Sequence, residues 1–146
     1  ANRLGIEFLD LDELLTETIG VSPADFLREN GEDAFRVAEA SALRVALQHD
    51  AVVSCGGGTV TYEPSRDLLR LHPFVIWLTA PLHVLVERVR SGDRPLLGDS
   101  PAIALAQLED SRTPLYQDVA TIEVRTDRPL DEVVEEIVDR MGELSS

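Results

Sequence analysis

The chain has 146 residues, of which 27 are acidic and 13 basic, giving a formal net charge of −14. This length suits one domain with a single core, and the acidity argues against a nucleic-acid surface, because phosphate backbones bind basic stripes. No apolar run approaches the length of a membrane span, and the one cysteine, Cys55, has no internal disulfide partner. We therefore expect a cytoplasmic protein with neither a nucleic-acid nor a membrane partner.

Taken in order, the chain alternates between strand and helix patterns. The expected elements are a helix tail over 1–4 capped by Gly5, a strand over 6–9, a helix to about 18, helices over 22–31 and 32–48, a strand from 51 that runs into glycines, a helix over 65–71, a strand over 74–78, a helix over 81–90, a loop over 91–100, a helix from 101 under a Ser100 cap that Pro114 interrupts, an edge strand over 121–125 and a helix over 130–141. Alternating strands and helices predict an α/β fold with a mostly parallel sheet and helices on both faces.

The most informative segment is the strand that ends at three consecutive glycines, Gly56, Gly57 and Gly58. Residues without Cβ let the backbone approach another group closely, and ligands of open α/β sheets bind beyond the carboxyl ends of strands. A flexible turn is the alternative interpretation. Cys55 precedes the glycines, and we expect it to be a small buried strand residue because no histidine and acid stand in a recognisable relation to it.

Two acids, Asp10 and Asp12, follow the first expected strand, with Leu11 between them turned to the opposite side. Acids at a strand end suit a metal-bound water and a reacting hydroxyl. They equally suit a helix cap followed by a first-turn acid.

The arginines are the other candidates for chemistry, because all 13 basic residues are arginine and their planar forks match carboxylate and phosphate groups. Arg36 and Glu39 are three apart on one expected helix and can touch; the alternative is a surface ion pair. Arg94 lies in a loop punctuated by Gly and Pro, as in a mobile lid, and an ordinary solvent-exposed arginine is the alternative there.

Five segments in this order and spacing resemble the shikimate kinase family, and the resemblance covers essentially the whole chain. They are Phe8-Leu-Asp10-Leu-Asp12, Gly31-Glu-Asp-Ala-Phe35-Arg36-Val-Ala-Glu39, Gly56-Gly-Gly58, Arg94-Pro-Leu-Leu97 and Arg112-Thr-Pro-Leu-Tyr116. The resemblance implies a doubly wound parallel sheet of the P-loop nucleoside-monophosphate-kinase-like type. It also implies one domain over residues 1–146, with a lid at about 91–100.

The resemblance implies that shikimate is the substrate and that its 3-hydroxyl is phosphorylated by ATP, a step in aromatic amino-acid biosynthesis. Asp12 would hold the attacking hydroxyl and take its proton. Arg36 and Arg112 would grip the substrate carboxylate, and Glu39 would fix the orientation of Arg36. The three glycines, Gly57 foremost, would form a backbone wall against the substrate ring.

The same resemblance implies a nucleotide site and a magnesium ion. Arg94 would reach the transferring phosphoryl group. Arg128 would pack on adenine, with Arg88 or Arg90 also close to it. Asp10 would lie near Mg²⁺ and bind it through water.

The 146 residues lack one feature that the family requires, a Gly-x-x-x-x-Gly-Lys-Ser/Thr loop, and they contain no lysine to complete it. In the family this loop follows a first strand at the centre of a five-stranded sheet. We therefore expect an N-terminally incomplete kinase domain that binds nucleotide weakly and turns over negligibly, unless a preceding segment or a partner chain supplies the strand. The alternatives are a non-catalytic module that binds shikimate and another small-molecule kinase, such as a gluconate kinase.

Overall fold

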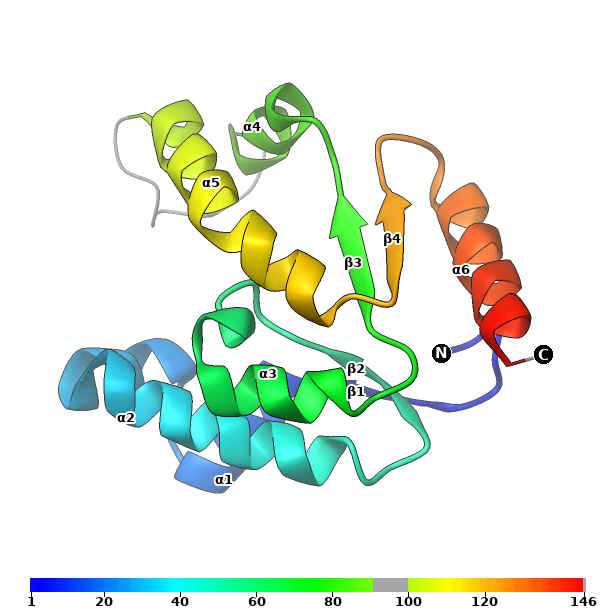
Figure 1. The fold of residues 1–146 in the computed structure, drawn as a ribbon. Coiled ribbons are helices and arrows are strands. Elements are labelled where there is room, and N and C mark those ends of the chain that lie inside the picture. Colours follow the sequence, from blue (N-terminus) through cyan, green and yellow to red (C-terminus); the bar gives the residue numbers. More distant parts are fainter. Residues whose placement is uncertain (91–99, 146) are drawn as a thin grey trace. The chain divides into compact units, whose positions relative to one another are not determined.

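The computed structural model describes residues 1–90 and 100–145 (Figure 1). The chain divides into two compact units, residues 1–71 and 72–146, and each unit is described by itself. The single domain over residues 1–146 stays a prediction. So does the lid at about 91–100, since residues 91–99 lie outside the described part of the chain.

The first unit combines three helices with a short parallel sheet. Strand β1 pairs with β2 in parallel, with Glu7 opposite Ala51 and Asp10 opposite Ser54. The side chains of Leu11, Leu15 and Leu43 are fully buried and form the centre of this unit. Its elements are β1 (Glu7–Asp10), α1 (Leu11–Ile19), α2 (Pro23–Ala46), β2 (Ala51–Ser54), the 3₁₀ turn η1 (Thr59–Thr61) and α3 (Glu63–Arg70).

Local sequence signals set the helix ends of this unit. Gly20 ends α1 in the left-handed conformation, with φ 76°, and Ser22 caps α2 by accepting a hydrogen bond from the backbone N–H of Asp25 at 3.1 Å. The expected break at Gly31 is also present: its φ of 83° and ψ of 171° kink α2, and the helix resumes at Glu32. The two helices expected over 22–31 and 32–48 are therefore the two halves of one kinked helix, α2.

The second unit has a parallel pair of strands with helices on both faces (Figure 1). On one face, α6 buries Val133 against Ile122 and Val124. On the other face, Trp77 of β3 stacks on Tyr116 of α5, with ring centroids 5.5 Å apart. The elements are β3 (Ile76–Thr79), α4 (Leu82–Arg90), α5 (Pro101–Val119), β4 (Ile122–Arg125) and α6 (Leu130–Leu144). The predicted α/β class is confirmed in this layering.

Two expectations for helix α5 are wrong. The helix continues through Pro114, and Ser100 makes no side-chain cap. A proline inside a helix costs about 3 kcal/mol through its missing N–H and its ring. The stack of Tyr116 on Trp77 holds the helical turn that follows Pro114 and offsets part of that cost.

The strand over 74–78 is shorter and less buried than the sequence predicts. It begins at Ile76, and the side chain of Leu78 is 56% exposed. Within the described residues β3 pairs only with β4, just as β2 pairs only with β1. Each sheet therefore has two strands, and an apolar strand that would be covered in a wider sheet stays partly open to water.

Candidate functional site

In the first unit, the carboxyl ends of β1 and β2 bring the predicted acids and glycines to one edge of the sheet. Asp10 ends β1 directly opposite Ser54, which ends β2. Asp12 stands in the first turn of α1, and Gly56 to Gly58 follow β2. This is the edge at which ligands of open α/β sheets bind.

The guanidinium of Arg36 reaches this edge from helix α2 and is held by two carboxylates. Its Nη1 donates to Glu39 Oε1 at 2.8 Å, while Nε and Nη2 contact Glu32 Oε1 at 3.0 and 2.9 Å. The guanidinium also lies over the ring of Phe35, 5.1 Å from its centroid, and its side chain is only 13% exposed. Burial acts to lower the pKa of Arg36, but the hydrogen bonds and charges of Glu39 and Glu32 outweigh it and raise the pKa.

Glu39 is the buried anchor of this arrangement. It is 2% exposed, and its second oxygen, Oε2, accepts a hydrogen bond from the hydroxyl of Thr59 at 3.0 Å. Thr59 itself is 1% exposed. The predicted contact between Arg36 and Glu39 is confirmed, whereas sequence reasoning missed two supporting residues. Glu32 stands four residues before Arg36, a spacing that could have identified it, but nothing in the sequence signals Thr59.

A side chain at Gly58 would collide with Arg36, whereas one at Gly56 would not. A Cβ added there would lie 2.4 Å from Nη2 of Arg36 and would displace the guanidinium. A Cβ on Gly56 would meet Glu39 Oε2 at 3.7 Å, an ordinary contact. The glycine segment therefore presents backbone directly to the arginine, while its role as a wall against a substrate ring stays a prediction.

The two acids at the end of β1 have different surroundings. Asp10 caps α1, since its Oδ1 accepts the backbone N–H of Asp12 at 2.9 Å. The pKa of Asp12 is raised by burial and by the charge of Asp10, with Arg36 acting in the opposite direction. A carboxylate with a raised pKa is a stronger base, which suits it to accept a proton.

Residues 1–90 and 100–145 contain no group of three or more His, Cys, Asp and Glu side chains that could hold a metal ion. Mg²⁺ commonly keeps several waters and uses one or two protein carboxylates. A single water-mediated contact from Asp10 is compatible with that chemistry and stays a prediction.

Cys55 is not the buried strand residue that the sequence predicts. It lies just after β2 and its surface is exposed. Neighbouring atoms nevertheless withdraw the thiol from water, and this desolvation, together with the charges of Glu39, Asp10 and Asp12, raises its pKa to about 11. A thiol in such a setting is a poor nucleophile at neutral pH.

We expect Cys55 to react with a disulfide reagent such as dithionitrobenzoate at least about tenfold more slowly at pH 7.5 than free cysteine, because its thiolate population is small. Stopped-flow absorbance measures this rate. Asp10→Asn removes one of the repelling charges and should accelerate the reaction. A rate equal to that of free cysteine would contradict the assigned environment.

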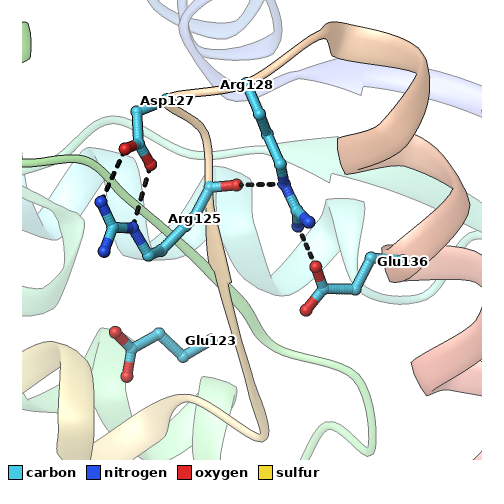
Figure 2. A pocket seen from close by; sticks show the side chains of 5 residues that line it. All are labelled: Glu123, Arg125, Asp127, Arg128 and Glu136. Carbon is cyan, nitrogen blue, oxygen red and sulfur yellow. Dashed lines mark hydrogen bonds and ion pairs between the residues drawn. The ribbon is translucent and has the colours of Figure 1, made fainter.

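In the second unit, Arg128 follows β4 and is fixed from two sides (Figure 2). Its Nε donates to the carbonyl oxygen of Arg125 at 3.1 Å, and its Nη2 forms an ion pair with Glu136 of α6. Arg125 makes two bonds to Asp127, at 2.9 and 2.6 Å. No local pattern in the sequence indicates the contact with Glu136. These residues line a pocket of about 440 Å³ together with Glu123.

A second pocket, of about 430 Å³, brings Arg88 and Arg128 to one place. Arg88 is held by Thr126, whose hydroxyl and carbonyl oxygens accept its hydrogen bonds at 2.9 and 2.5 Å. Besides these two arginines, Thr79 and Thr126, the lining is aliphatic and consists of Leu78, Leu85, Leu130 and Val133. A flat apolar ring flanked by guanidinium groups would fit this lining.

The roles of two further predicted arginines, Arg94 and Arg112, stay predictions. Arg94 lies outside the described residues. Arg112 is on α5, in the second unit, whereas Arg36 is in the first. Their joint grip on one carboxylate therefore stays a prediction.

The parallel strand pairs and the helices that cover them define the class as an α/β protein. Comparison with known proteins identifies the family. The family model described as shikimate kinase matches residues 1–142. The chain belongs to the shikimate kinase family.

Relatives and solved structures agree with this. The shikimate kinase of Corynebacterium efficiens is 38% identical over 145 residues, which cover 97% of this chain and 85% of the relative. The structure of shikimate kinase from Acinetobacter baumannii in complex with shikimate has a TM-score of 0.83 and 29% identity, covering 95% of this chain and 82% of that one. The structure of shikimate kinase from Bacteroides thetaiotaomicron has a TM-score of 0.85 and 26% identity, and the match covers 99% of this chain and 86% of that one. Among the described residues, no helix is both long and apolar enough to cross a membrane.

Proposed function

We propose that this chain binds shikimate and presents its 3-hydroxyl for phosphorylation by ATP. The observation that carries the proposal is the fixed guanidinium of Arg36, held by buried Glu39 beside the raised-pKa carboxylate of Asp12. A hydroxylated carboxylic acid needs both a cation for its carboxylate and a base for its hydroxyl, and this edge of the sheet offers both.

Each residue at this edge would have one task. Arg36 binds the substrate carboxylate, with Arg112 as a second clamp, and its rigid mounting limits the loss of side-chain freedom on binding. Asp12 accepts the hydrogen bond of the attacking hydroxyl and then its proton. The absence of a side chain at Gly58 keeps the guanidinium in place.

The residues fit the two ends of the nucleotide unequally. The pocket that Arg88 and Arg128 flank suits the adenine ring. The phosphates, in contrast, have no Gly-x-x-x-x-Gly-Lys-Ser/Thr loop among these 146 residues. Arg94 is the residue that we assign to the transferring phosphoryl group, and Asp10 to a water of the magnesium ion.

A second candidate function is shikimate binding without phosphoryl transfer. The composition of these 146 residues favours it, because the predicted residues for binding shikimate are present and the lysine of a phosphate-binding loop is not. Incubating the chain with shikimate and ATP, alone and as a chimera that carries the phosphate loop of a relative, separates the two. Transfer only in the chimera would support an enzyme acceptor site, and transfer in neither would support the binding module. Using gluconate in place of shikimate as the phosphate acceptor tests the alternative that the chain belongs to another small-molecule kinase, such as a gluconate kinase.

Replacing Arg36 with alanine should weaken shikimate binding by at least about tenfold, because a charge-assisted pair of hydrogen bonds is lost. Isothermal titration calorimetry of the chain with shikimate measures this. Arg44→Ala is the matched control, since Arg44 is an exposed arginine on the same helix. If Arg36→Ala and Arg44→Ala bind shikimate equally well, the carboxylate assignment is wrong.

A further inference from the structure

The carboxylate of Glu32 occupies the part of Arg36 that a ligand would be expected to use. One oxygen, Oε1, lies 3.0 Å from Nε and 2.9 Å from Nη2, so it bridges one edge of the guanidinium. A guanidinium has five N–H donors, and edges of this kind are those that bind carboxylates. Glu32 therefore makes the contact that a substrate carboxylate would make.

The two carboxylates on Arg36 differ sharply in how firmly they are fixed. The Glu39 side chain is 2% exposed and is also held by Thr59, whereas the Glu32 side chain is 61% exposed. Glu32 is also the first residue after the kink at Gly31, where the helical hydrogen-bond pattern is interrupted. Releasing Glu32 exposes a charge that is already mostly in water, while releasing Glu39 would leave a buried carboxylate unpaired.

The charges around Arg36 favour such a release. The groups that act on Arg36 are the carboxylates of Glu32 and Glu39, and its neighbour Asp12 lies beside a further acid, Asp10. At Arg36, an incoming anion meets a guanidinium whose single positive charge is already outweighed by two carboxylates. Exchanging one carboxylate for another leaves the local charge unchanged, whereas adding a third does not.

We propose that Glu32 is an internal competitor for the ligand carboxylate: it occupies Arg36 in the free protein and is displaced when substrate binds, while Glu39 stays. This inference rests on the proposed function in one respect, namely that the ligand is shikimate. It also gives a basis for selectivity, because a simple carboxylate merely replaces Glu32. A ligand with further hydroxyl contacts gains enough in addition to displace it.

The test is a calorimetric titration of the wild-type chain and Glu32→Gln with two probes, shikimate and benzoate. We expect Glu32→Gln to bind shikimate about two- to fivefold more tightly, the range for loss of one exposed ionic competitor. Benzoate should gain at least as much, because it has no hydroxyl contacts with which to compete. Glu29→Gln is the matched control: Glu29 is an exposed acid on the same helix whose ion pair is with Arg28.

The outcomes separate this inference from the proposed function. Equal or weaker binding of both probes by Glu32→Gln would overturn the exchange and make Glu32 a support of Arg36. An equal gain in Glu29→Gln would also overturn it, because the effect would then be one of net charge. Tighter benzoate binding by Glu32→Gln without any binding of shikimate would uphold the exchange and reject shikimate as the ligand. If neither probe binds to Glu32→Gln, the exchange is also rejected, because the substitution removes the competing carboxylate and should leave the guanidinium of Arg36 available.

Discussion

Replacing Glu39 with glutamine should lower the free energy of unfolding by about 2 kcal/mol. Removing one partner of a buried ion pair costs about 3–5 kcal/mol, and the effect here is smaller because Arg36 keeps Glu32. Urea unfolding followed by circular dichroism measures the change. Glu32→Gln is the comparison, since its exposed contact contributes less than about 1 kcal/mol. Equal losses in the two variants would show that burial does not distinguish them.

The hydrogen bond from Thr59 gives this prediction a second, independent readout. In a double-mutant cycle of Glu39→Leu, which has no acceptor, with Thr59→Val, we expect a coupling of about 1 kcal/mol, the usual net value of one hydrogen bond. Strictly additive losses would mean that the bond contributes nothing to stability. Thr59→Ser, which keeps the hydroxyl, should retain most of the coupling.

Replacing Asp12 with asparagine should reduce phosphorylation of shikimate by about 10²–10⁴-fold, the usual contribution of a general base. The rate is measured in the chimera that supplies the phosphate loop, by a coupled assay of ADP release. Shikimate affinity should change much less than kcat, because Arg36 rather than Asp12 binds the carboxylate. Glu13→Gln, at the next position of the same helix, is the control. A variant with unchanged kcat would remove Asp12 from the reaction.

The same substitution also has a pH-dependent effect on stability. Because the folded Asp12 keeps its proton to a higher pH than the unfolded value of 3.8, the folded state binds more protons in that interval, and its stability falls as the pH rises through it. Asp12→Asn does not titrate, so its stability relative to the wild type should increase across the interval and then level off. Burial withdraws the Asp12 carboxyl group from water only in part, since the residue as a whole is exposed, and this limits the gain to less than about 1 kcal/mol. Urea unfolding between pH 3 and 7 measures the difference, and a decrease would contradict the direction of the pKa shift.

Features that depend on neighbouring residues could be predicted from the sequence. The cap at Ser22, the left-handed Gly20 and the break at Gly31 follow from backbone rules that act within a few residues. The contact between Arg36 and Glu39 follows from helical spacing in the same way.

Features that depend on distant residues could not be predicted. Thr59 reaches Glu39 from 20 positions away, and Glu136 reaches Arg128 across a turn and into the next helix. Pro114 is the clearest failure, because the local rule for proline is sound and the stack of Tyr116 on Trp77 overrides it. Each of these three features depends on three-dimensional packing, which a local sequence pattern does not contain.

The parallel pairing of the strands also affects how each unit can reach its folded state. In the first unit Glu7 pairs with Ala51, which is distant along the chain, and in the second unit Val75 meets Thr121 across a sequence separation of 46. Neither sheet can start from a hairpin, so a long stretch of chain loses its freedom before any strand contact forms. Folding of each unit should therefore begin in its helices, and the edge that carries Asp10 and Gly58 should be among the last parts to form.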